Sequence, residues 1–286
     1  MSNLPTSQSS LEEEKDSANA QRAVALLDIL GFRARMEEED PQTLFDETLG
    51  QLPAIIGTSS ELISGPEIRA VQFSDTIFLW ATVGAKREAG ARADPFDCVE
   101  AVCIATFGLM HRCARRGIFL RGAIAFGECF VSDSPPAFVG RAIASAAKLE
   151  RRQQWSGVAL DDSAEAILQY DSQWSGGLRS FVRYLVPMKK PPDEVRIVIK
   201  WPWGMHLPHP LDLMRSRVRI LSEDIEAKII HTTAFFETFQ NLFGYPNRRV
   251  QPITMIDGEI PPLADAAKTH DPIDWHANAL ARIRQT

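Results

Sequence analysis

The sequence predicts a mixed α+β fold in which a strand, a helix, a hairpin, a helix and a strand are followed by shorter elements. Three observations lead to this prediction. Apolar runs of strand length alternate with segments that have helical spacing. Two runs rich in β-branched and aromatic residues meet at Ser74-Asp75, which is typical of a tight hairpin. Glycines and prolines separate the segments where turns are required.

The composition is that of a globular protein. Of 286 residues, 45% are hydrophobic and 24% are charged, so the chain can bury a sizeable core. A formal net charge of −6 gives no overall attraction to nucleic acid or to an anionic membrane. The chain begins with polar residues instead of a signal peptide, and no apolar run reaches the roughly 18 residues of a membrane span. We therefore expect a soluble, cytoplasmic protein that binds neither nucleic acid nor membrane.

The cysteines favour a structural role. They form no C-x-x-C pair, and three of them fall in one apolar helical segment. We expect reduced thiols that pack in the core, as is usual for a cytosolic protein. The residues concerned are Cys98, Cys103, Cys113 and Cys129.

The first predicted strand lies within residues 24–32 and delivers a single carboxylate. An apolar run reaches Asp28, and Gly31 then precedes a helical segment. Backbone N–H groups that open a helix bind phosphate, and a carboxylate oxygen binds a hard divalent cation. An aspartate in this position is, by itself, more often the N-cap of the following helix. The choice between ligand and cap therefore depends on residues further along the chain.

Residues 33–56 predict an amphipathic helix that is interrupted near Pro41. The acidic run at residues 37–40 is expected on its solvated face. The hairpin at residues 68–83 follows and carries Asp75 at its tip. Alone, such an aspartate most simply caps its own turn.

A core-facing helix is predicted next, over residues 95–116, and Gly117 ends it. Residues 119–128 predict a strand whose glycines permit close approach by another backbone or a ligand. After a turn at Pro135-Pro136, residues 141–150 predict a helix with small residues that can lie close to a sheet. The remaining predicted elements of the domain are a strand at 158–160, a helix at 162–168, and strands at 181–186 and 195–199.

The C-terminal part has a different character. Residues 201–210 are rich in proline and aromatic residues and predict a linker or docking arm. Residues 211–243 predict a long helical stretch that covers the sheet or joins a partner subunit, and later prolines predict an extended tail. The predicted parts are a disordered segment at residues 1–20, a domain at residues 21–203, and a helical extension with a tail at residues 204–286.

The predicted order of elements is that of a ferredoxin-like βαββαβ core with extra strands and a C-terminal helical extension. This topology does not specify chemistry. Four motifs in register with it resemble the class III nucleotidyl cyclases, over about residues 22–200. They are Leu27-Asp28-Ile29-Leu30-Gly31-Phe32, Phe73-Ser74-Asp75, Leu120-Arg121-Gly122-Ala123-Ile124-Ala125-Phe126-Gly127, and residues 140–150.

The resemblance implies a metal site. Class III cyclases carry metal aspartates on the first strand and the following hairpin, which correspond to Asp28 and Asp75. The Ile29 carbonyl would be a further ligand for two divalent cations, Mn²⁺ or Mg²⁺. Two cations suit the cyclisation of a nucleoside triphosphate, because negative charge develops on both sides when the 3′ hydroxyl attacks the α-phosphate and pyrophosphate leaves. The backbone N–H groups that would hold the β- and γ-phosphates belong to Leu30, Gly31 and Phe32.

Two positions differ from the purine cyclases of this family. Those enzymes carry a lysine four residues before the hairpin aspartate and an aspartate three residues before the helix-opening glycine. Here these positions are Val71 and Ala137. Neither side chain can supply the charged or bidentate hydrogen bonds that select a purine edge. We therefore disfavour an adenylate cyclase.

The helix after that glycine differs as well. The family's asparagine and arginine near the reacting centre correspond to Ala144 and Lys148. Lys148 offers a cation without the forked geometry of arginine. Arg121 and Arg141 are the other catalytic candidates, and for each of them a surface or packing role is an equal alternative.

This combination resembles the pyrimidine cyclases of bacterial Pycsar antiphage defence. The resemblance implies a homodimer with composite active sites that converts UTP to 3′,5′-cyclic UMP and pyrophosphate. It also implies a separate effector protein that the cyclic nucleotide activates. Three alternatives stay open: a cytidylate cyclase that makes cyclic CMP, a purine cyclase with unusual base contacts, and an inactive cyclase-like module that binds a nucleotide or a partner, which Ala144 motivates.

Overall fold

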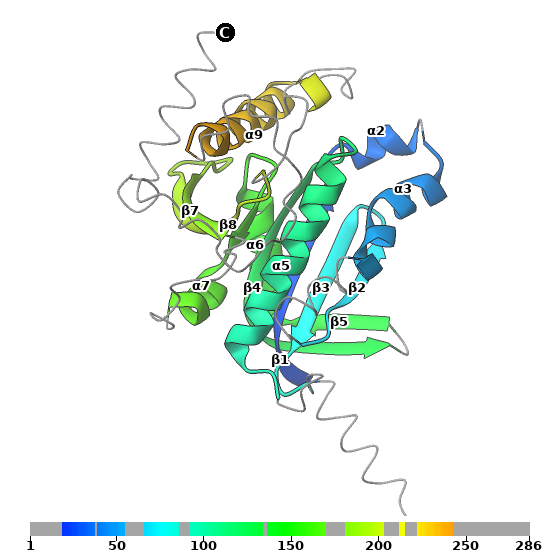
Figure 1. Ribbon diagram of the computed structural model, residues 1–286, viewed down its shortest axis with the longest axis vertical. Coiled ribbons are helices and arrows are strands. Elements are labelled where there is room, and N and C mark those ends of the chain that lie inside the picture. The colour runs from blue at the N-terminus through cyan, green and yellow to red at the C-terminus, as the bar shows by residue number, and fades with distance from the viewer. Residues whose placement is uncertain are drawn as a thin grey trace, which may run out of the picture.

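An eight-stranded mixed sheet organises the fold (Figure 1). The computed structural model describes residues 19–37, 39–54, 66–85, 92–133, 136–169, 181–202, 212–214 and 222–242. The strands are β1 (Asn19–Ile29), β2 (Arg69–Phe73), β3 (Thr76–Thr82), β4 (Leu120–Asp133), β5 (Pro136–Gly140), β6 (Val158–Leu160), β7 (Phe181–Val186) and β8 (Glu194–Ile199). Their order in the sheet is β2-β3-β1-β4-β6-β8-β7, and β5 pairs with β4.

The helices connect the strands in the predicted sequence. They are α2 (Phe32–Met36), α3 (Pro41–Glu47), the 3₁₀ helix η1 (Leu49–Gln51), α5 (Pro95–Ala114), α6 (Arg141–Arg152), α7 (Asp162–Gln169) and α9 (Glu223–Leu242). Strands β2, β3, β1 and β4 pair antiparallel in that order, with α2 and α3 before the hairpin and α5 after it. This arrangement confirms the α+β class and the βαββαβ core. The extra strands begin with β5, which pairs antiparallel with β4, and continue with β6, which lies parallel to β4.

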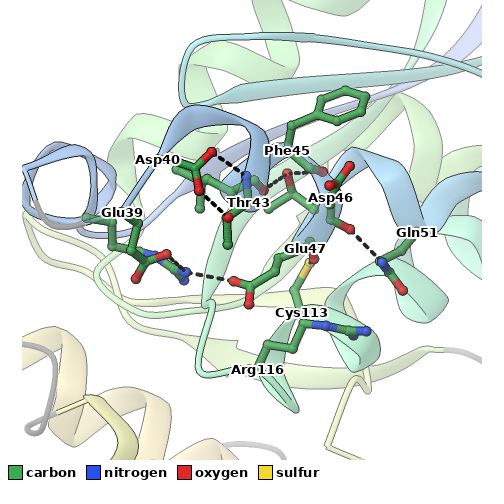
Figure 2. Close-up of polar contacts among 12 residues, drawn as sticks. Glu39, Asp40, Thr43, Phe45, Asp46, Glu47, Gln51, Cys113 and Arg116 are labelled. Carbon is green, nitrogen blue, oxygen red and sulfur yellow. Dashed lines mark hydrogen bonds and ion pairs between the residues drawn. The ribbon is translucent and has the colours of Figure 1, made fainter.

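The helix predicted over residues 33–56 is divided into three pieces, and Figure 2 shows the middle one. Pro41 stands at the start of α3, where its missing N–H is not needed, so the interruption near Pro41 is confirmed. The Asp40 side chain caps α3 by accepting from the N–H groups of Gln42 and Thr43 at 3.0 and 3.2 Å.

The acidic run at residues 37–40 is largely solvated as expected, since Glu37 and Asp40 are exposed, but Glu39 also takes part in an ion pair. Glu39 and Glu47, both labelled in Figure 2, accept from the guanidinium of Arg35 at 2.5 and 2.8 Å. Arg35 is buried, so these carboxylates compensate a charge that water does not reach. Glu37 and Asp40 are exposed, and the Asp40 side chain is occupied as a cap.

Two glycines set how closely neighbouring strands approach. A Cβ atom on Gly122 would lie 2.4 Å from the Leu26 carbonyl oxygen, and one on Gly140 would lie 2.4 Å from the Glu128 carbonyl oxygen. Any larger residue would push the paired backbones apart. The predicted close approach of another backbone to the β4 glycines is confirmed at Gly122.

The helix α9 covers one end of the sheet, near β7 and β8 (Figure 1). Phe235 is fully buried and meets Trp155 and Tyr184 edge to face, at ring-centroid distances of 4.6 and 4.7 Å. A hydrogen bond of 2.8 Å from the Ser156 N–H to the Thr232 hydroxyl adds a polar contact. Within the predicted helical stretch, α9 begins at Glu223 and covers the sheet, and residues 212–214 are also helical. The predicted disordered segment ends earlier than expected, because β1 begins at Asn19. The rest of that segment, most of the predicted linker, part of the helical stretch and the extended tail fall on residues 1–18, 203–211, 215–221 and 243–286, which lie outside the described residues.

All the cysteines are free and buried, which confirms their expected role as reduced core thiols. In the ranges that the structure describes, no helix combines the length and the apolar character that crossing a bilayer requires.

Candidate functional site

The carboxyl end of β1 meets the hairpin tip and α6 around a cavity of about 300 Å³. Asp28 lies directly opposite Thr76 of β3 and Arg121 of β4. Residues opposite one another in paired strands point to the same face of a sheet. This face carries the cavity, which is lined by Leu26, Leu27, Asp28, Asp75, Thr76 and Arg121 from the sheet and by Ala147, Glu150 and Arg151 from α6.

The hairpin tip is fixed to the end of β1 through the backbone. Ser74 adopts a left-handed conformation with φ of 57°, which turns the chain sharply before Asp75. The Ile29 N–H donates to the Asp75 carbonyl oxygen at 2.9 Å. Because the N–H and C=O of an extended residue point to the same edge of the strand, the Ile29 carbonyl also faces the hairpin tip. The structure therefore brings together Asp28, Ile29 and Asp75, the three residues expected to bind metal.

Arg121 lies between two carboxylates. Its Nη2 atom is 2.5 Å from Glu150 Oε1 and 3.2 Å from Asp28 Oδ2, and its Nε donates to Glu150 Oε1 at 2.6 Å. The side chains of Arg121 and Glu150 are 10% and 8% exposed, whereas that of Asp28 is 28% exposed. Arg121 and Glu150 thus form a buried ion pair, and Asp28 stands at its cavity side.

The surroundings disfavour a charge on Asp28. The pKa of its carboxyl is raised to about 6, chiefly by burial. The Arg121 guanidinium opposes this rise, while the nearby charges of Glu150 and Asp75 and a hydrogen bond with Asp75 contribute to it. Two carboxylates so close together in a half-buried cavity would be stabilised by a divalent cation.

The donor set fits such a cation. Carboxylate and carbonyl oxygens are the ligands that Mg²⁺ and Mn²⁺ prefer, and Mg²⁺ commonly uses one or two carboxylates together with waters and substrate phosphates. Among the described residues, no group of three or more His, Cys, Asp or Glu side chains is arranged to hold a metal. The remaining ligands would therefore come from water or from phosphate.

Of the three backbone N–H groups expected to bind phosphate, one already has a hydrogen-bond partner in the sheet. The Leu30 N–H donates to the Phe119 carbonyl oxygen at 2.9 Å and so belongs to the sheet. Leu30 is therefore a correction to the expected phosphate ligands, because its amide already has a partner. Gly31, with φ of 74°, turns the chain into α2, and the amides of Gly31 and Phe32 remain the candidates.

The catalytic candidates on α6 do not reach this cavity within one subunit. Arg141 and Lys148 are exposed, and neither lines the cavity. They share the exposed side of α6 with Ala144, since positions three or four apart lie on the same side of a helix. Of the three predicted cations, the structure brings only Arg121 to Asp28.

Three residues at this site were not found from the sequence. Glu150 and Arg151 lie three and four positions after Ala147, so helical spacing places all three on the cavity side of α6. Lys189 follows β7, and its backbone N–H donates to the Arg152 carbonyl oxygen at 2.7 Å. Burial lowers the pKa of Lys189, the charges of Arg121 and Lys228 lower it further, and Asp224 and Glu150 oppose them. No local pattern marks Lys189, because its position depends on how β7 and β8 pair.

Apolar residues occupy positions 71 and 137, where the resemblance implies the contacts that select a purine. Val71 lies opposite Phe78, whose ring contacts those of Trp80 and Phe138 at centroid distances of 5.2 and 5.1 Å. Ala137 lies on β5, directly before Phe138. The side chains at positions 71 and 137 contribute no charge and no side-chain hydrogen-bonding group.

Comparisons with known proteins gave structural similarities alone. No protein-family model and no curated protein sequence matches the chain. The guanylate cyclase domain of RhGC from Catenaria anguillulae, in complex with GTP, is 14% identical with a TM-score of 0.41, over 63% of this chain and 96% of that one. A bacterial light-regulated adenylyl cyclase is 12% identical with a TM-score of 0.42, over 70% of this chain and 99% of that one. An adenylate/guanylate cyclase/hydrolase from Silicibacter pomeroyi is 16% identical with a TM-score of 0.39, over 63% of this chain and 95% of that one.

Proposed function

We propose that the chain is a class III nucleotidyl cyclase that converts a nucleoside triphosphate into a 3′,5′-cyclic nucleotide and pyrophosphate. The observation that carries this proposal is the meeting of Asp28 and Asp75 at one cavity beside Arg121. These aspartates occur at the positions where the resemblance to that family implies metal ligands. The pKa of the partly exposed Asp28 carboxyl, raised to about 6, adds support, because perturbed pKa values are common at functional sites.

In the proposed mechanism, Asp28, Asp75 and the Ile29 carbonyl hold two divalent cations, Mn²⁺ or Mg²⁺. The bound cations supply stabilisation for the negative charge that develops on the α-phosphate and on the departing pyrophosphate. Asp28 must be ionised for this role, and the adjacent Arg121 favours that state. Asp28 lies on β1 and Asp75 at the hairpin tip, and the Ile29 to Asp75 hydrogen bond ties the two segments together, so the separation of the aspartates is fixed before substrate arrives.

The triphosphate is held by the positive charges around the cavity. Arg121 and Arg151 line it, and Lys189 is near enough to Arg121 for the two charges to interact. Arginine forks bind phosphate oxygens in pairs, while a lysine provides a point charge. The Gly31 and Phe32 amides add neutral donors at the same end of β1.

The proposed substrate is a pyrimidine nucleotide, UTP in preference to CTP. Support comes from Val71 and Ala137, because an apolar environment at these positions leaves a purine edge without partners and so disfavours purines. The product, cyclic UMP, would act as a second messenger in antiphage defence and activate a separate effector protein. Cyclic CMP is the alternative product.

We further propose that the enzyme works as a homodimer with composite sites. Arg141 and Lys148 are exposed on α6 and lie outside the cavity of their own subunit. In a dimer of the implied kind, Lys148 of one subunit would approach the α-phosphate bound at the aspartates of the other. Its cation would stabilise the charge of the transition state.

The decisive experiment is incubation of the protein with each of the four nucleoside triphosphates and Mn²⁺ or Mg²⁺, followed by chromatography of the products. Cyclic UMP is expected from UTP. Formation of a cyclic purine nucleotide would keep the cyclase proposal and overturn the pyrimidine preference. Absence of every cyclic product would overturn the proposal that the chain is a cyclase.

A second candidate function is a non-catalytic nucleotide-binding module. Its support is Ala144, whose methyl group cannot replace the asparagine amide that the resemblance implies near the reacting centre. Calorimetry with the same nucleotides separates the two functions. Binding without turnover would favour the module, whereas binding with turnover favours the cyclase.

A further inference from the structure

We infer that Arg121 is a positioning residue that occupies the Asp28 carboxylate while no metal is bound and gives it up to an arriving cation, with Glu150 holding the guanidinium throughout. This inference rests on the proposed function, because it concerns the same metal site. It adds a competition for Asp28 within the chain, which the metal must overcome.

Arg121 lies closer to Glu150 than to Asp28, as the inference requires. Arg121 makes two short contacts with Glu150, at 2.5 and 2.6 Å, and one longer contact with Asp28, at 3.2 Å. Charge-assisted hydrogen bonds between arginine and carboxylate are strongest at about 2.7–2.9 Å. The Asp28 contact is therefore the weaker one, and it is the one that a cation would break.

The two contacts also differ in burial, since Glu150 is buried with Arg121 whereas Asp28 is partly exposed. The Arg121 and Glu150 side chains are almost inaccessible, so breaking their pair would leave an uncompensated charge in the interior. Asp28 borders the cavity and can be reached by an ion from solvent. A metal thus has access to the carboxylate that Arg121 holds loosely, and it leaves the tightly held one in place.

The backbone restricts the change to side chains. Asp28 and Arg121 are paired across β1 and β4. The next residue, Gly122, packs so tightly on β1 that its missing Cβ would meet the Leu26 carbonyl oxygen at 2.4 Å. The pairing of β1 with β4 holds the Arg121 Cα opposite Asp28, so release depends on the guanidinium turning toward Glu150 or toward a bound phosphate.

The competition has a consequence for binding order. Without nucleotide, a cation competes with Arg121 for Asp28 and its affinity is reduced. A triphosphate offers the released guanidinium a new anionic partner, so the metal and the nucleotide each favour binding of the other.

The test is Mn²⁺ binding to the metal-free, nucleotide-free protein, measured by calorimetry and by electron paramagnetic resonance. The informative variant is the double substitution Arg121→Gln with Glu150→Gln. It removes one positive and one negative charge, so the net charge around Asp28 is unchanged, and two amides of similar shape remain in place of the ion pair. We expect Mn²⁺ to bind this variant more tightly than the wild type, by about twofold to fivefold, the range for loss of one partly exposed ionic contact.

The controls separate this result from other effects. The double substitution Arg196→Gln with Glu194→Gln removes a comparable ion pair outside the cavity and should leave Mn²⁺ affinity unchanged. Damage to the fold would weaken binding, so a gain in affinity is not explained by a structural role. The single substitution Glu150→Gln removes one of the two carboxylates that Arg121 contacts, so that Asp28 is the one that remains. Arg121 should then hold Asp28 more firmly, and Mn²⁺ binding should weaken.

The possible outcomes distinguish the inference from the function on which it rests. If Asp28→Ala abolishes Mn²⁺ binding but the Arg121/Glu150 double variant binds with wild-type or lower affinity, the competition is overturned and the metal site stands. If neither the wild type nor the double variant shows binding that depends on Asp28, the competition and the proposed metal site both fail.

Discussion

Asp28, a proposed metal ligand, lies in an electrostatic environment that is unfavourable for its charge. Burial and the neighbouring carboxylates raise its pKa from 3.8 to about 6 in the folded protein. A carboxyl with a raised pKa binds its proton more tightly when folded, so its contribution to stability is full below the unfolded value near 3.8 and is lost as the pH rises through about 6. Above that pH, the metal-free fold carries a charge that it does not favour.

Replacing Asp28 should therefore stabilise the metal-free protein while destroying its metal site. We expect Asp28→Asn in the presence of EDTA to melt about 2–4 °C higher than the wild type at pH 8, which corresponds to about 1 kcal/mol. The difference should shrink as the pH is lowered from 6 toward 4, because the wild-type carboxyl becomes protonated. Scanning calorimetry across this pH range measures it, with the exposed Asp46→Asn as control. A lower melting temperature for Asp28→Asn at pH 8 would contradict this account of the charge.

Asp75 is expected to matter for turnover and little for stability. It lies at the hairpin tip, and its backbone carbonyl, not its side chain, ties the tip to Ile29. Asp75→Ala should lower the rate of cyclic nucleotide formation by at least about 100-fold, because one carboxylate cannot hold two cations in place. Circular dichroism should show the fold retained, and Asp46→Ala should keep its activity. Near-wild-type turnover in Asp75→Ala would remove the two-metal assignment.

At the scale of elements, local patterns predicted the core well and long-range pairing poorly. The periodicity of residues 95–116 and the turn chemistry at Ser74-Asp75 correspond to α5 and to the hairpin, since both signals are local. Strand β5 was not predicted. Its residues lie between the predicted turn at Pro135-Pro136 and α6, and only pairing with the far end of β4 makes them a strand.

The residues of the candidate site also divide into those that local patterns predicted and those whose position depends on long-range contacts. Asp28, Ile29 and Asp75 could be found because each stands at the end of a recognisable strand. The ion pair between Arg121 and Glu150 could not, because the two residues lie on different elements, and a sequence does not show which side chains meet across a sheet and a helix. The partner of the Leu30 amide was missed for the same reason, as it lies on the segment before β4.

The contact between β4 and β1 should be sensitive to a single methyl group. In Gly122→Ala, the new Cβ would lie 2.4 Å from the Leu26 carbonyl oxygen and 2.5 Å from the Leu27 Cδ2 atom, so the strands must separate beside Asp28. We expect a loss of about 2–4 kcal/mol in the free energy of unfolding, measured by urea denaturation. Gly50→Ala is the matched control, because its nearest contact would be an ordinary 3.4 Å, and it should change stability by less than about 1 kcal/mol. Equal effects of the two substitutions would show that the close approach is not rigid.

At the scale of the whole molecule, the question is whether one chain contains a complete active site. Lys148 is exposed on α6, and the aspartates of its own chain open on a cavity that it does not line. If the sites are composite, two different inactive subunits can restore one intact site between them. Asp28→Ala and Lys148→Ala proteins should each be inactive alone.

Mixing the two inactive proteins should recover about a quarter of wild-type activity, since half of randomly formed dimers are mixed and each mixed dimer has one intact site. Asp28→Ala mixed with Asp75→Ala serves as control and should recover nothing, because both residues belong to the same cavity. Turnover is measured after subunit exchange, with size-exclusion chromatography to verify dimers. No recovery in the first mixture would place the whole site within a single chain.

The position of α9 also determines when the protein can finish folding during its synthesis. The aromatic rings of Trp155 and Tyr184 lack their cover until Phe235 has been made, and Ser156, whose hydroxyl donates to the Leu120 carbonyl oxygen beside Arg121, waits for Thr232. At about 5–20 residues per second, roughly 10 to 40 s pass between the synthesis of Asp28 and that of Phe235. For that interval the nascent chain carries Asp28 and Asp75 on a sheet whose far end still exposes an aromatic surface, so protection from aggregation arrives late in translation.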